Sequence, residues 1–393
     1  MLTEIKYYLT SKKQIFAVSF SRLSDSLGGG AVYFALPLFI SKINPSTLPN
    51  AFLAGMVIAM WGIVATIVQP FFGVWIDKKG KPKFLLVVGL LLTSFVILTY
   101  TVVKDLYSLF TVRIALGITE ALVITAGVVV IASISRREER GESFGIFYTL
   151  TDVGFALSPI LAGILLECYG FNEVFVSGAV LTLLSAILVS KLVPEIDARP
   201  SKEKIEISKE IFYISIALFF TVAALASIVP LEEGFIEYMG LTPLSFGITY
   251  SSYIFTRTLF NTPVGRLSDR IGRKKVFVAG IILLGISTIL IPFCKNFGQI
   301  LLLRSIQGVL VAFVYSPATA LIADKSEKSL GVGMGVTNSS LTLGLAAGPI
   351  IAGVLGGFVG FSAPFYVFGI MIVLSGIFTT FSVSEVKNGK KVK

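Results

Sequence analysis

The sequence predicts an all-α membrane protein with twelve transmembrane helices arranged as two pseudo-symmetric six-helix bundles. Three observations predict this fold. The chain is 54% hydrophobic and only 14% charged, whereas soluble globular domains are typically ~25% charged. Apolar runs long enough to cross a hydrocarbon core of ~30 Å recur along the whole chain. A short motif rich in glycine and lysine occurs twice, roughly half a chain length apart.

Twelve apolar runs are each long enough to span a bilayer at a rise of about 1.5 Å per residue. They are predicted at residues 14–40, 50–76, 84–103, 106–134, 143–168 and 172–192, and then at 211–230, 244–266, 276–294, 298–323, 331–356 and 361–383. A polar stretch of mixed charge at 193–210 has the composition of a cytoplasmic linker. The predicted bundles therefore occupy 1–192 and 211–393.

The positive charges are distributed unevenly between the predicted loops. Most of the 33 Lys and Arg residues lie on alternate loops, and the intervening loops contain only Lys42, Lys104 and Lys295. By the positive-inside rule, both termini are expected in the cytoplasm of a multi-pass protein of the plasma membrane. The net charge of +10 then reflects topology and contact with anionic lipid, and no nucleic-acid partner is expected.

The duplicated motif has the same order of residues in both copies. The first copy contains Gly73, Asp77, Gly80 and Lys81, and the second contains Gly265, Asp269, Gly272 and Arg273. The second glycine of each copy permits the left-handed backbone that a short reversal needs. The aspartate is placed to accept from backbone N–H groups at a helix terminus. Each copy is predicted to be a tight cytoplasmic turn between two spans.

This pattern resembles the signature loop of the major facilitator superfamily, G-x-x-x-D-x-x-G-[RK]-x-[RK], here present twice with the family's spacing. The resemblance covers nearly the whole chain, from Pro37 to Gly353. It implies a secondary active transporter in which two bundles rock about a central site for a small-molecule substrate.

Spans 5 and 11 share a second repeated pattern of small residues and proline. Its members are Gly154, Pro159 and Gly163 in span 5, and Gly344 and Pro349 in span 11. Small residues let helix backbones approach closely, and proline bends a helix. The segment around Pro159 resembles the antiporter motif Gly-Pro-x-x-Gly-Gly of drug:proton antiporters, with Ser158 and Ala162 replacing two glycines. The resemblance favours proton-coupled export, and plain helix packing with either transport direction is the alternative.

Few ionisable residues lie inside the predicted spans, where each costs about 2.5–3.5 kcal/mol at a helix centre. They are Arg22, Asp25, Arg113, Glu120, Asp152, Arg257 and Arg304. Because the chain has no histidine, proton chemistry must use carboxylates. We expect Asp25, Glu120 and Asp152 to be candidates for proton coupling. The three arginines Arg113, Arg257 and Arg304 are expected to set the electrostatics of a cavity.

Each of these residues has an alternative interpretation. Arg22 lies near the inner end of its span, where it can anchor the helix. Asp25 is either a proton carrier or a structural helix–helix hydrogen-bond partner. Arg113 and Glu120 are seven residues apart, so they share a helix face that we expect to face the cavity. Glu120 is either a proton- or cation-responsive carboxylate or half of a buried ion pair.

Asp152 and Arg257 lie at similar predicted depths from the inner ends of spans 5 and 8. The resemblance implies that these spans meet across the interface between the bundles. We hypothesise that the two residues form an ion pair that breaks during alternating access. The alternative is that each side chain is satisfied within its own bundle.

Aromatic residues make up 12% of the chain, and some lie in spans that line cavities in the family. The substrate-cavity candidates are Tyr33, Trp61, Tyr148, Tyr250 and Tyr253, with Phe34 and Phe260 beside them. An apolar, aromatic cavity suits lipophilic or cationic solutes better than sugars. For any single residue, packing against lipid is the alternative.

Other reaction classes find no support in the sequence. There is no G-x-x-x-x-G-K-[ST] phosphate loop, no His/Cys cluster and no histidine for a Ser-His-Asp triad. We therefore expect no enzyme activity, metal or cofactor. Cys168 and Cys294 fall near outer helix ends and are expected to be unrelated thiols, with a disulfide as the alternative.

The preferred function is proton-coupled export of small lipophilic or cationic compounds, as in multidrug efflux, by a monomer. The same fold also allows proton-coupled uptake of a metabolite such as a sugar or an organic acid. A transporter-derived sensor and a lipid flippase without a coupled ion are the remaining alternatives.

Overall fold

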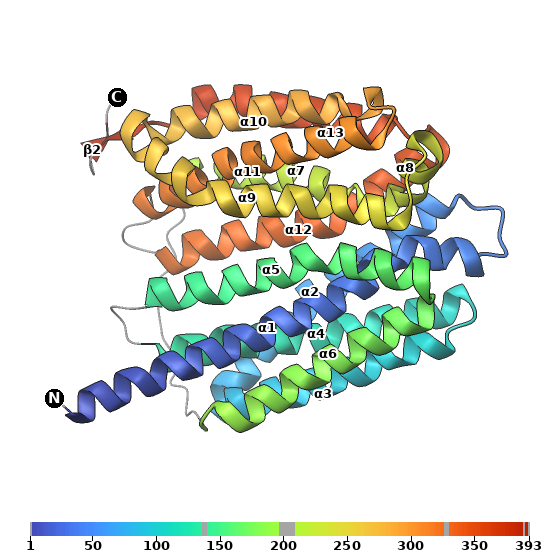
Figure 1. Cartoon of the computed structure of the whole chain (residues 1–393). Coiled ribbons are helices and arrows are strands. Elements are labelled where there is room, and N and C mark those ends of the chain that lie inside the picture. The colour runs from blue at the N-terminus through green and yellow to red at the C-terminus, as the bar shows by residue number, and fades with distance from the viewer. Residues whose placement is uncertain (1, 136–139, 196–208, 326–329, 388–389, 392–393) are drawn as a thin grey trace. The chain divides into compact units, whose positions relative to one another are not determined.

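The computed structural model describes the backbone of residues 2–135, 140–195, 209–325, 330–387 and 390–391. Nearly all of this backbone is helical, and the predicted all-α fold is confirmed (Figure 1). The long helices are α1 (Leu2–Ile43), α2 (Asn50–Lys79), α3 (Pro82–Thr99), α4 (Leu106–Ile134), α5 (Arg140–Cys168), α6 (Phe171–Leu192), α7 (Lys209–Ala226), α9 (Pro243–Ile271), α10 (Arg273–Ile289), α11 (Phe297–Lys325), α12 (Leu330–Phe358) and α13 (Ala363–Ser382).

Short elements extend or follow these helices. They are the 3₁₀ turns η1 (Tyr100–Val102), η3 (Val229–Leu231) and η4 (Ile291–Phe293), the helix α8 (Glu232–Met239), and the antiparallel strands β1 (Val386–Lys387) and β2 (Lys390–Lys391). Span 7 was expected to end at residue 230, but its helical path continues through η3 and α8 to Met239. Pro230 lies in η3, and because proline lacks an N–H group it cannot donate to the carbonyl of Ala226, where α7 ends.

Eleven of the described helical segments are long and apolar enough to cross a membrane. The exception among the twelve long helices is α9, which at 29 residues is long enough but more polar. It carries Arg257 and Asn261 in its middle and charged residues at its C-terminal end. Polar side chains within a span commonly mark a functional site.

The chain forms two compact units. The first contains Met1–Phe39 and Ile63–Ser201, and the second contains Ile40–Gly62 and Lys202–Lys393. The first part of α2 thus packs with the second unit: a Cβ on Gly353 of α12 would lie 2.6 Å from the carbonyl oxygen of Ala51. The sequence boundaries of the two bundles stay a prediction.

In the first unit, α3 packs against both α4 and α6, and α1 is held by glycines. A Cβ on Gly28 would lie 2.7 Å from the carbonyl oxygen of Gly178 on α6. A Cβ on Gly30 would overlap the side chain of Ser158 on α5. Because lipid tails are as apolar as leucine, such close backbone contacts are what hold membrane helices together.

In the second unit, glycines likewise allow close packing, here between other helices. Here α9 packs on α11, α7 packs on α12, and α10 lies between α11 and α13. Gly344 of α12 lies against α7, where an added Cβ would meet the carbonyl oxygen of Phe219 at 2.8 Å. Pro159 and Pro349 are both buried and lie inside the unbroken helices α5 and α12. Gly163 is buried on α5, four residues after Pro159.

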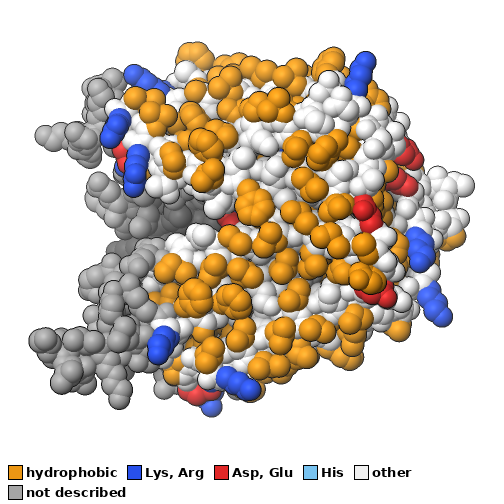
Figure 2. Space-filling view, in the orientation of Figure 1, with side chains coloured by type: hydrophobic (Ala, Val, Ile, Leu, Met, Phe, Trp, Pro, Cys, Tyr) orange, Lys and Arg blue, Asp and Glu red, His pale blue; other side chains and the backbone are white. Residues whose placement is uncertain are grey.

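The outward faces of the helices are apolar. Phe71, Phe95, Leu259 and Phe381 are each at least 67% exposed. Figure 2 shows hydrophobic side chains spread over the helix faces, with charged side chains gathered near helix ends. An apolar surface of this extent is expected for helices that face lipid.

Both signature loops reverse direction at the second glycine. Gly80 and Gly272 have φ values of 64° and 111°, which only glycine adopts readily. A Cβ added to Gly73 would meet no neighbouring atom within 4 Å, whereas a Cβ on Gly265 would approach Ser316. Lys81 is exposed, and the side chain of Asp77 lies outside the described residues.

In the second signature loop, the hydrogen-bond partner of Asp269 differs from the predicted one. Asp269 accepts from the side chain of Arg273, at 3.0 Å from Nε and 2.9 Å from Nη2, and not from a backbone N–H group. The N-terminus of α10 is instead met by Glu385, whose Oε1 accepts from the Lys274 N–H at 3.2 Å. In the first unit, Glu195 follows α6 and pairs with Lys83 at 3.3 Å.

Candidate functional site

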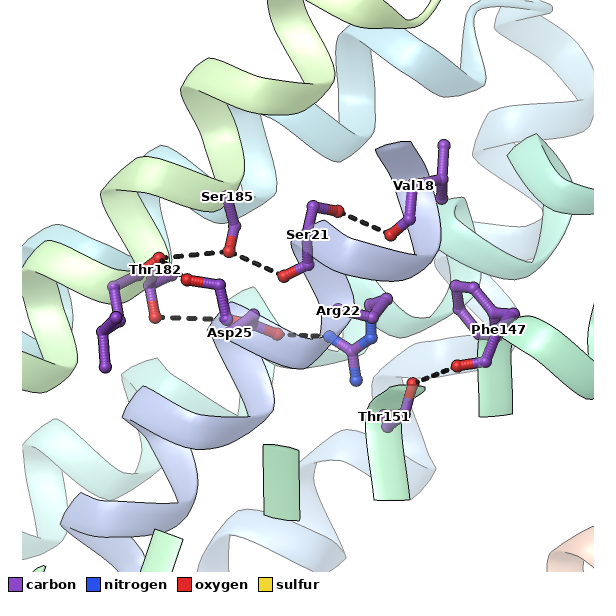
Figure 3. A network of polar contacts seen from close by, with 10 residues as sticks. Val18, Ser21, Arg22, Asp25, Phe147, Thr151, Thr182 and Ser185 are labelled. Carbon is purple, nitrogen blue, oxygen red and sulfur yellow. Dashed lines mark hydrogen bonds and ion pairs between the residues drawn. The ribbon is translucent and has the colours of Figure 1, made fainter. Parts of the chain in front are cut away.

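The central acid of the first unit lies between α1 and α6. Asp25 is 2% exposed and pairs with Arg22 one turn earlier on α1. The Thr182 hydroxyl of α6 donates to Asp25 Oδ1 at 3.2 Å, and Ser185 donates to the Ser21 carbonyl at 2.7 Å (Figure 3). The helix–helix hydrogen bond considered as an alternative for Asp25 is therefore present. A proton-carrying role for the same carboxyl stays a prediction.

The close contact of α1 with α6 makes these bonds possible. Gly28 and Gly178 remove the side chains that would hold the two backbones apart. Short hydroxyl side chains then reach across, as where Ser24 donates to the Leu181 carbonyl at 2.9 Å. This contact between α1 and α6, which we call the helix seam, is polar because it contains small residues and hydroxyl side chains.

A second acid approaches α1 from α4. A Cβ on Gly29 would lie 3.9 Å from Glu120 Oε1, so this carboxyl faces α1. Glu120 interacts electrostatically with Asp25, Arg22 and Arg113, and Arg113 is 2% exposed. We call Arg22, Asp25, Arg113 and Glu120 the acid–arginine cluster. It brings the Arg113–Glu120 face of α4 beside Arg22 and Asp25 of α1, which the sequence had not linked to it.

Aromatic rings border this cluster. Tyr33 interacts electrostatically with Arg113, and its ring packs on Phe34 and Phe155 at centroid distances of 5.1 and 6.1 Å. Tyr148 of α5 is half exposed and contacts Phe147. These two tyrosines lie in the first unit.

In the second unit, two arginines share one tyrosine ring. Arg304 of α11 has its guanidinium carbon 4.5 Å from the centroid of Tyr253 and 5.2 Å from that of Tyr250. Arg257 of α9 lies 6.0 Å from Tyr253 and 5.9 Å from Tyr315. We call these five residues the arginine–tyrosine cluster. A guanidinium within ~6 Å of a ring centroid is attracted to the ring face.

Arg304 is the most deeply buried member of this cluster. It is 1% exposed, and its Nη1 donates to Gln307 Oε1 at 2.9 Å. Its Nε and Nη2 groups have no hydrogen-bond partner among the described residues. Gly308, on the next turn, lets α9 approach closely, because a Cβ there would overlap Thr256.

The remaining predicted site residues are placed as follows. Asp152 is half-buried on α5 in the first unit, and Arg257 is half-buried on α9 in the second. Their pairing stays a prediction. Trp61 lies on the part of α2 that belongs to the second unit, and Phe260 is partly exposed on α9.

Sequence reasoning missed one buried acid. Glu232 begins α8 and is 2% exposed, and within the described part of the chain its Oε2 has no hydrogen-bond partner. The predicted span 7 ends at Pro230 and therefore leaves Glu232 outside the membrane. The apolar residues on both sides of the Glu232–Glu233 pair were the signal that the span continues.

The described residues contain no group of three or more His, Cys, Asp or Glu side chains that could hold a metal ion. Cys168 and Cys294 are both free thiols. Cys168 is exposed, whereas burial raises the pKa of the Cys294 thiol above its usual value.

The sequence family can be assigned from this fold and its repeat. The family model of the Major Facilitator Superfamily matches residues 18–212 and, a second time, residues 211–393. The chain belongs to the Major Facilitator Superfamily. The predicted family is confirmed, and each half of this Major Facilitator Superfamily chain carries one copy of the repeat.

Curated relatives of this superfamily member include multidrug efflux pumps. The efflux pump PmrA of Streptococcus pneumoniae is 26% identical over 87% of this chain and 89% of its own length. The quinolone resistance protein NorA of Staphylococcus aureus is 24% identical over 93% of this chain and 95% of its own length. An uncharacterised transporter of this superfamily, MJ1560 of Methanocaldococcus jannaschii, is 33% identical over 48% of this chain and half of its own length.

Solved structures of the Major Facilitator Superfamily share the fold. A bacterial homologue of the human lysosomal transporter Spinster, in an inward-facing and occupied conformation, matches with a TM-score of 0.80. The match covers 94% of this chain and 96% of that one at 12% identity. The human organic anion transporter MFSD10 matches with a TM-score of 0.68 at 13% identity, covering 94% and 99%. At these identities the likeness concerns the fold alone.

Proposed function

We propose that this transporter exports small lipophilic compounds by alternating access and uses the proton gradient to drive export. The acid–arginine cluster is the observation that carries the proposal. Asp25 and Glu120 come from two helices and interact electrostatically; both also interact with Arg22, and Glu120 interacts with Arg113 as well. A membrane-embedded carboxyl of this kind is the side chain that a proton-driven transporter needs in a chain without histidine.

Proton binding acts through the partners of Asp25. The ionised carboxylate accepts from Arg22 and from Thr182, and so ties α1 to α6. A proton on Asp25 removes the ion pair and releases Arg22 toward Glu120. The helix seam and the charge of the cluster then change in the same event. Protonation is thereby coupled to a shift of α1.

The direction and the substrate class rest on other observations. PmrA and NorA, whose matches each span most of this chain, are named as efflux and resistance proteins. The ring cluster of Tyr33, Phe34 and Phe155 borders the acid–arginine cluster and offers apolar faces that suit lipophilic compounds. We place the transporter in the plasma membrane as a monomer, with both termini in the cytoplasm.

Proteoliposomes with an imposed pH gradient test the proposal. Wild type should move a lipophilic dye in response to the gradient, and a protonophore should abolish that flux. Asp25→Asn and Glu120→Gln should each lose gradient-driven flux while still binding the dye. Glu173→Gln is the matched control, because Glu173 is an exposed acid at the start of α6.

The same measurement separates the alternatives. Wild-type flux from both neutralised variants would contradict proton coupling through this cluster. Dye movement opposite to the export direction would instead indicate uptake. Dye binding without any flux would indicate a sensor, and flux that ignores the gradient would indicate an uncoupled flippase.

A further inference from the structure

Arg304 is a buried cation whose donors are only partly used. One of its groups bonds Gln307 at 2.9 Å, and Nε and Nη2 have no acceptor in the described part of the chain. Among the described residues no carboxylate lies within ion-pair distance of it. Leaving buried, charged donors unsatisfied is costly, so their presence calls for an acceptor that the surrounding side chains do not supply.

The two halves of the chain treat the equivalent arginine differently. Arg113 in the first half and Arg304 in the second occupy matching places in the repeat. Seven residues after Arg113, on the same helix face, is Glu120, which interacts electrostatically with it. Seven residues after Arg304 is Val311, which is fully buried. The second unit has kept the arginine and lacks the acid at this position.

Positive charge is concentrated around Arg304. The guanidinium carbons of Arg304 and Arg257 both lie within 6.0 Å of the Tyr253 ring centroid. The acidic side chain described on α9 is Asp269, which lies near the C-terminal end of the helix and bonds Arg273. The described side chains of α11 include no acid. A buried cation in a low-dielectric span favours an anion beside it.

The unused donors also have the geometry for a particular anion. Nε and Nη2 carry parallel N–H bonds on one edge of the guanidinium, and this edge binds both oxygens of a carboxylate or a related oxyanion. The guanidinium carbon lies within 5.2 Å of the ring centroids of Tyr250 and Tyr253, and the Nε–Nη2 edge has no hydrogen-bond partner among the described residues. A ligand bound there needs an oxyanion group, and the aromatic side chains around it favour an apolar body.

We propose that the arginine–tyrosine cluster binds the oxyanion group of an amphiphilic organic anion, with Arg304 as its main ligand. This inference rests on the proposed transport function and names its substrate class. It narrows the expected class of lipophilic or cationic compounds: the transported compounds are lipophilic carboxylates or sulfonates. Arg257 adds positive charge to the site, and Gln307 orients the Arg304 guanidinium.

Binding to the purified full chain in detergent tests the proposal without any gradient. The probes are 4-phenylbutyrate and 4-phenylbutylammonium, which share a skeleton and differ in charge. Wild type should bind the anion at least ~10-fold more tightly than the cation, as one lost charge-assisted bond pair implies. Arg304→Gln should remove most of this difference. Arg304→Lys keeps the charge but not the two-donor edge, and should weaken anion binding several-fold.

A second variant supplies the missing counter-ion within the chain. Val311→Glu places an acid where the first half has Glu120, and should abolish anion binding while Arg304 is retained. Arg270→Gln is the control, because it removes an exposed arginine from the end of α9 and should leave both affinities unchanged. Thermal melting identifies any variant that fails to fold, and the conservative Arg304→Lys then carries the comparison.

The outcomes separate this inference from the proposed function. Equal binding of both probes, or anion binding that survives Arg304→Gln, would overturn the anion site. Anion binding that depends on Arg304, in a chain whose flux ignores the pH gradient, would support the site and contradict proton-coupled export. If the pH gradient drives flux of the cation and Arg304→Gln leaves that flux unchanged, proton-coupled export would be supported and the anion site contradicted.

Discussion

Gly28 of α1 and Gly178 of α6 meet backbone to backbone in the first unit. A Cβ on either glycine would lie within 2.9 Å of the carbonyl oxygen of the other. This contact is the point from which the polar seam around Asp25 extends, because it sets the distance between the two helices. The hydrogen bond from Thr182 to Asp25 depends on it.

Enlarging Gly28 should therefore separate the two helices. Gly28→Val is expected to destabilise the first unit by about 1–3 kcal/mol, the usual cost of overpacking a tight contact. It should also reduce gradient-driven flux, because Thr182 can no longer reach Asp25. Thermal unfolding in detergent and proteoliposome flux measure the two effects. Gly145→Ala, at a glycine with no atom near its Cβ position, is the control and should change neither.

Glu385 and Glu195 occupy matching places after the last helix of each half, but they should differ in their contribution to stability. Glu385 accepts from the Lys274 N–H at the start of α10, and its loss in Glu385→Ala should cost about 0.5–2 kcal/mol, as for a helix N-cap. Glu195 is 72% exposed and pairs with Lys83, so Glu195→Ala should cost about 0–1 kcal/mol. Hydrogen exchange at the first turns of α10 and α3 distinguishes them. Equal protection loss in both variants would contradict this ranking.

The predicted pairing of Asp152 with Arg257 can be tested by exchanging the charges. Asp152→Arg and Arg257→Asp should each abolish transport, since each leaves two like charges in the proposed pair. The double exchange should restore a measurable share of the flux. Flux is measured in proteoliposomes, with expression and melting temperature checked for all three variants. A double variant as inactive as the singles would count against the pair.

The two cysteines should differ in reactivity and in its dependence on pH. Only the thiolate reacts with maleimide, and the raised pKa of Cys294 leaves less thiolate near pH 7 than at an ordinary thiol. Exposed Cys168 should therefore be labelled first at pH 7. Raising the pH to 9 should speed labelling of Cys294 more than labelling of Cys168. Mass spectrometry of the labelled chain measures both rates, and equal rates at pH 7 would contradict the assignment.

Several features of the protein are local and could be predicted from the sequence. Helix length and apolarity identify the spans, because a bilayer requires an unbroken apolar run of fixed length. The reversals at Gly80 and Gly272 follow from the backbone freedom of a single residue. The doubling of the chain is visible in the order of its glycines and prolines. None of these depends on which helix packs against which.

The partners of the charged side chains were decided by the tertiary structure. Helical periodicity indicates that Arg113 and Glu120 share a face, but not that Gly29 lies opposite or that Asp25 bonds Thr182, 157 positions away. It could not reveal that Arg304 lies beside two tyrosine rings and has unused donors. Such contacts form between helices far apart in sequence, and close approach at small residues determines which faces meet. Sequence alone therefore determined where the long helices lie and where the chain repeats, and packing decided which charges have partners.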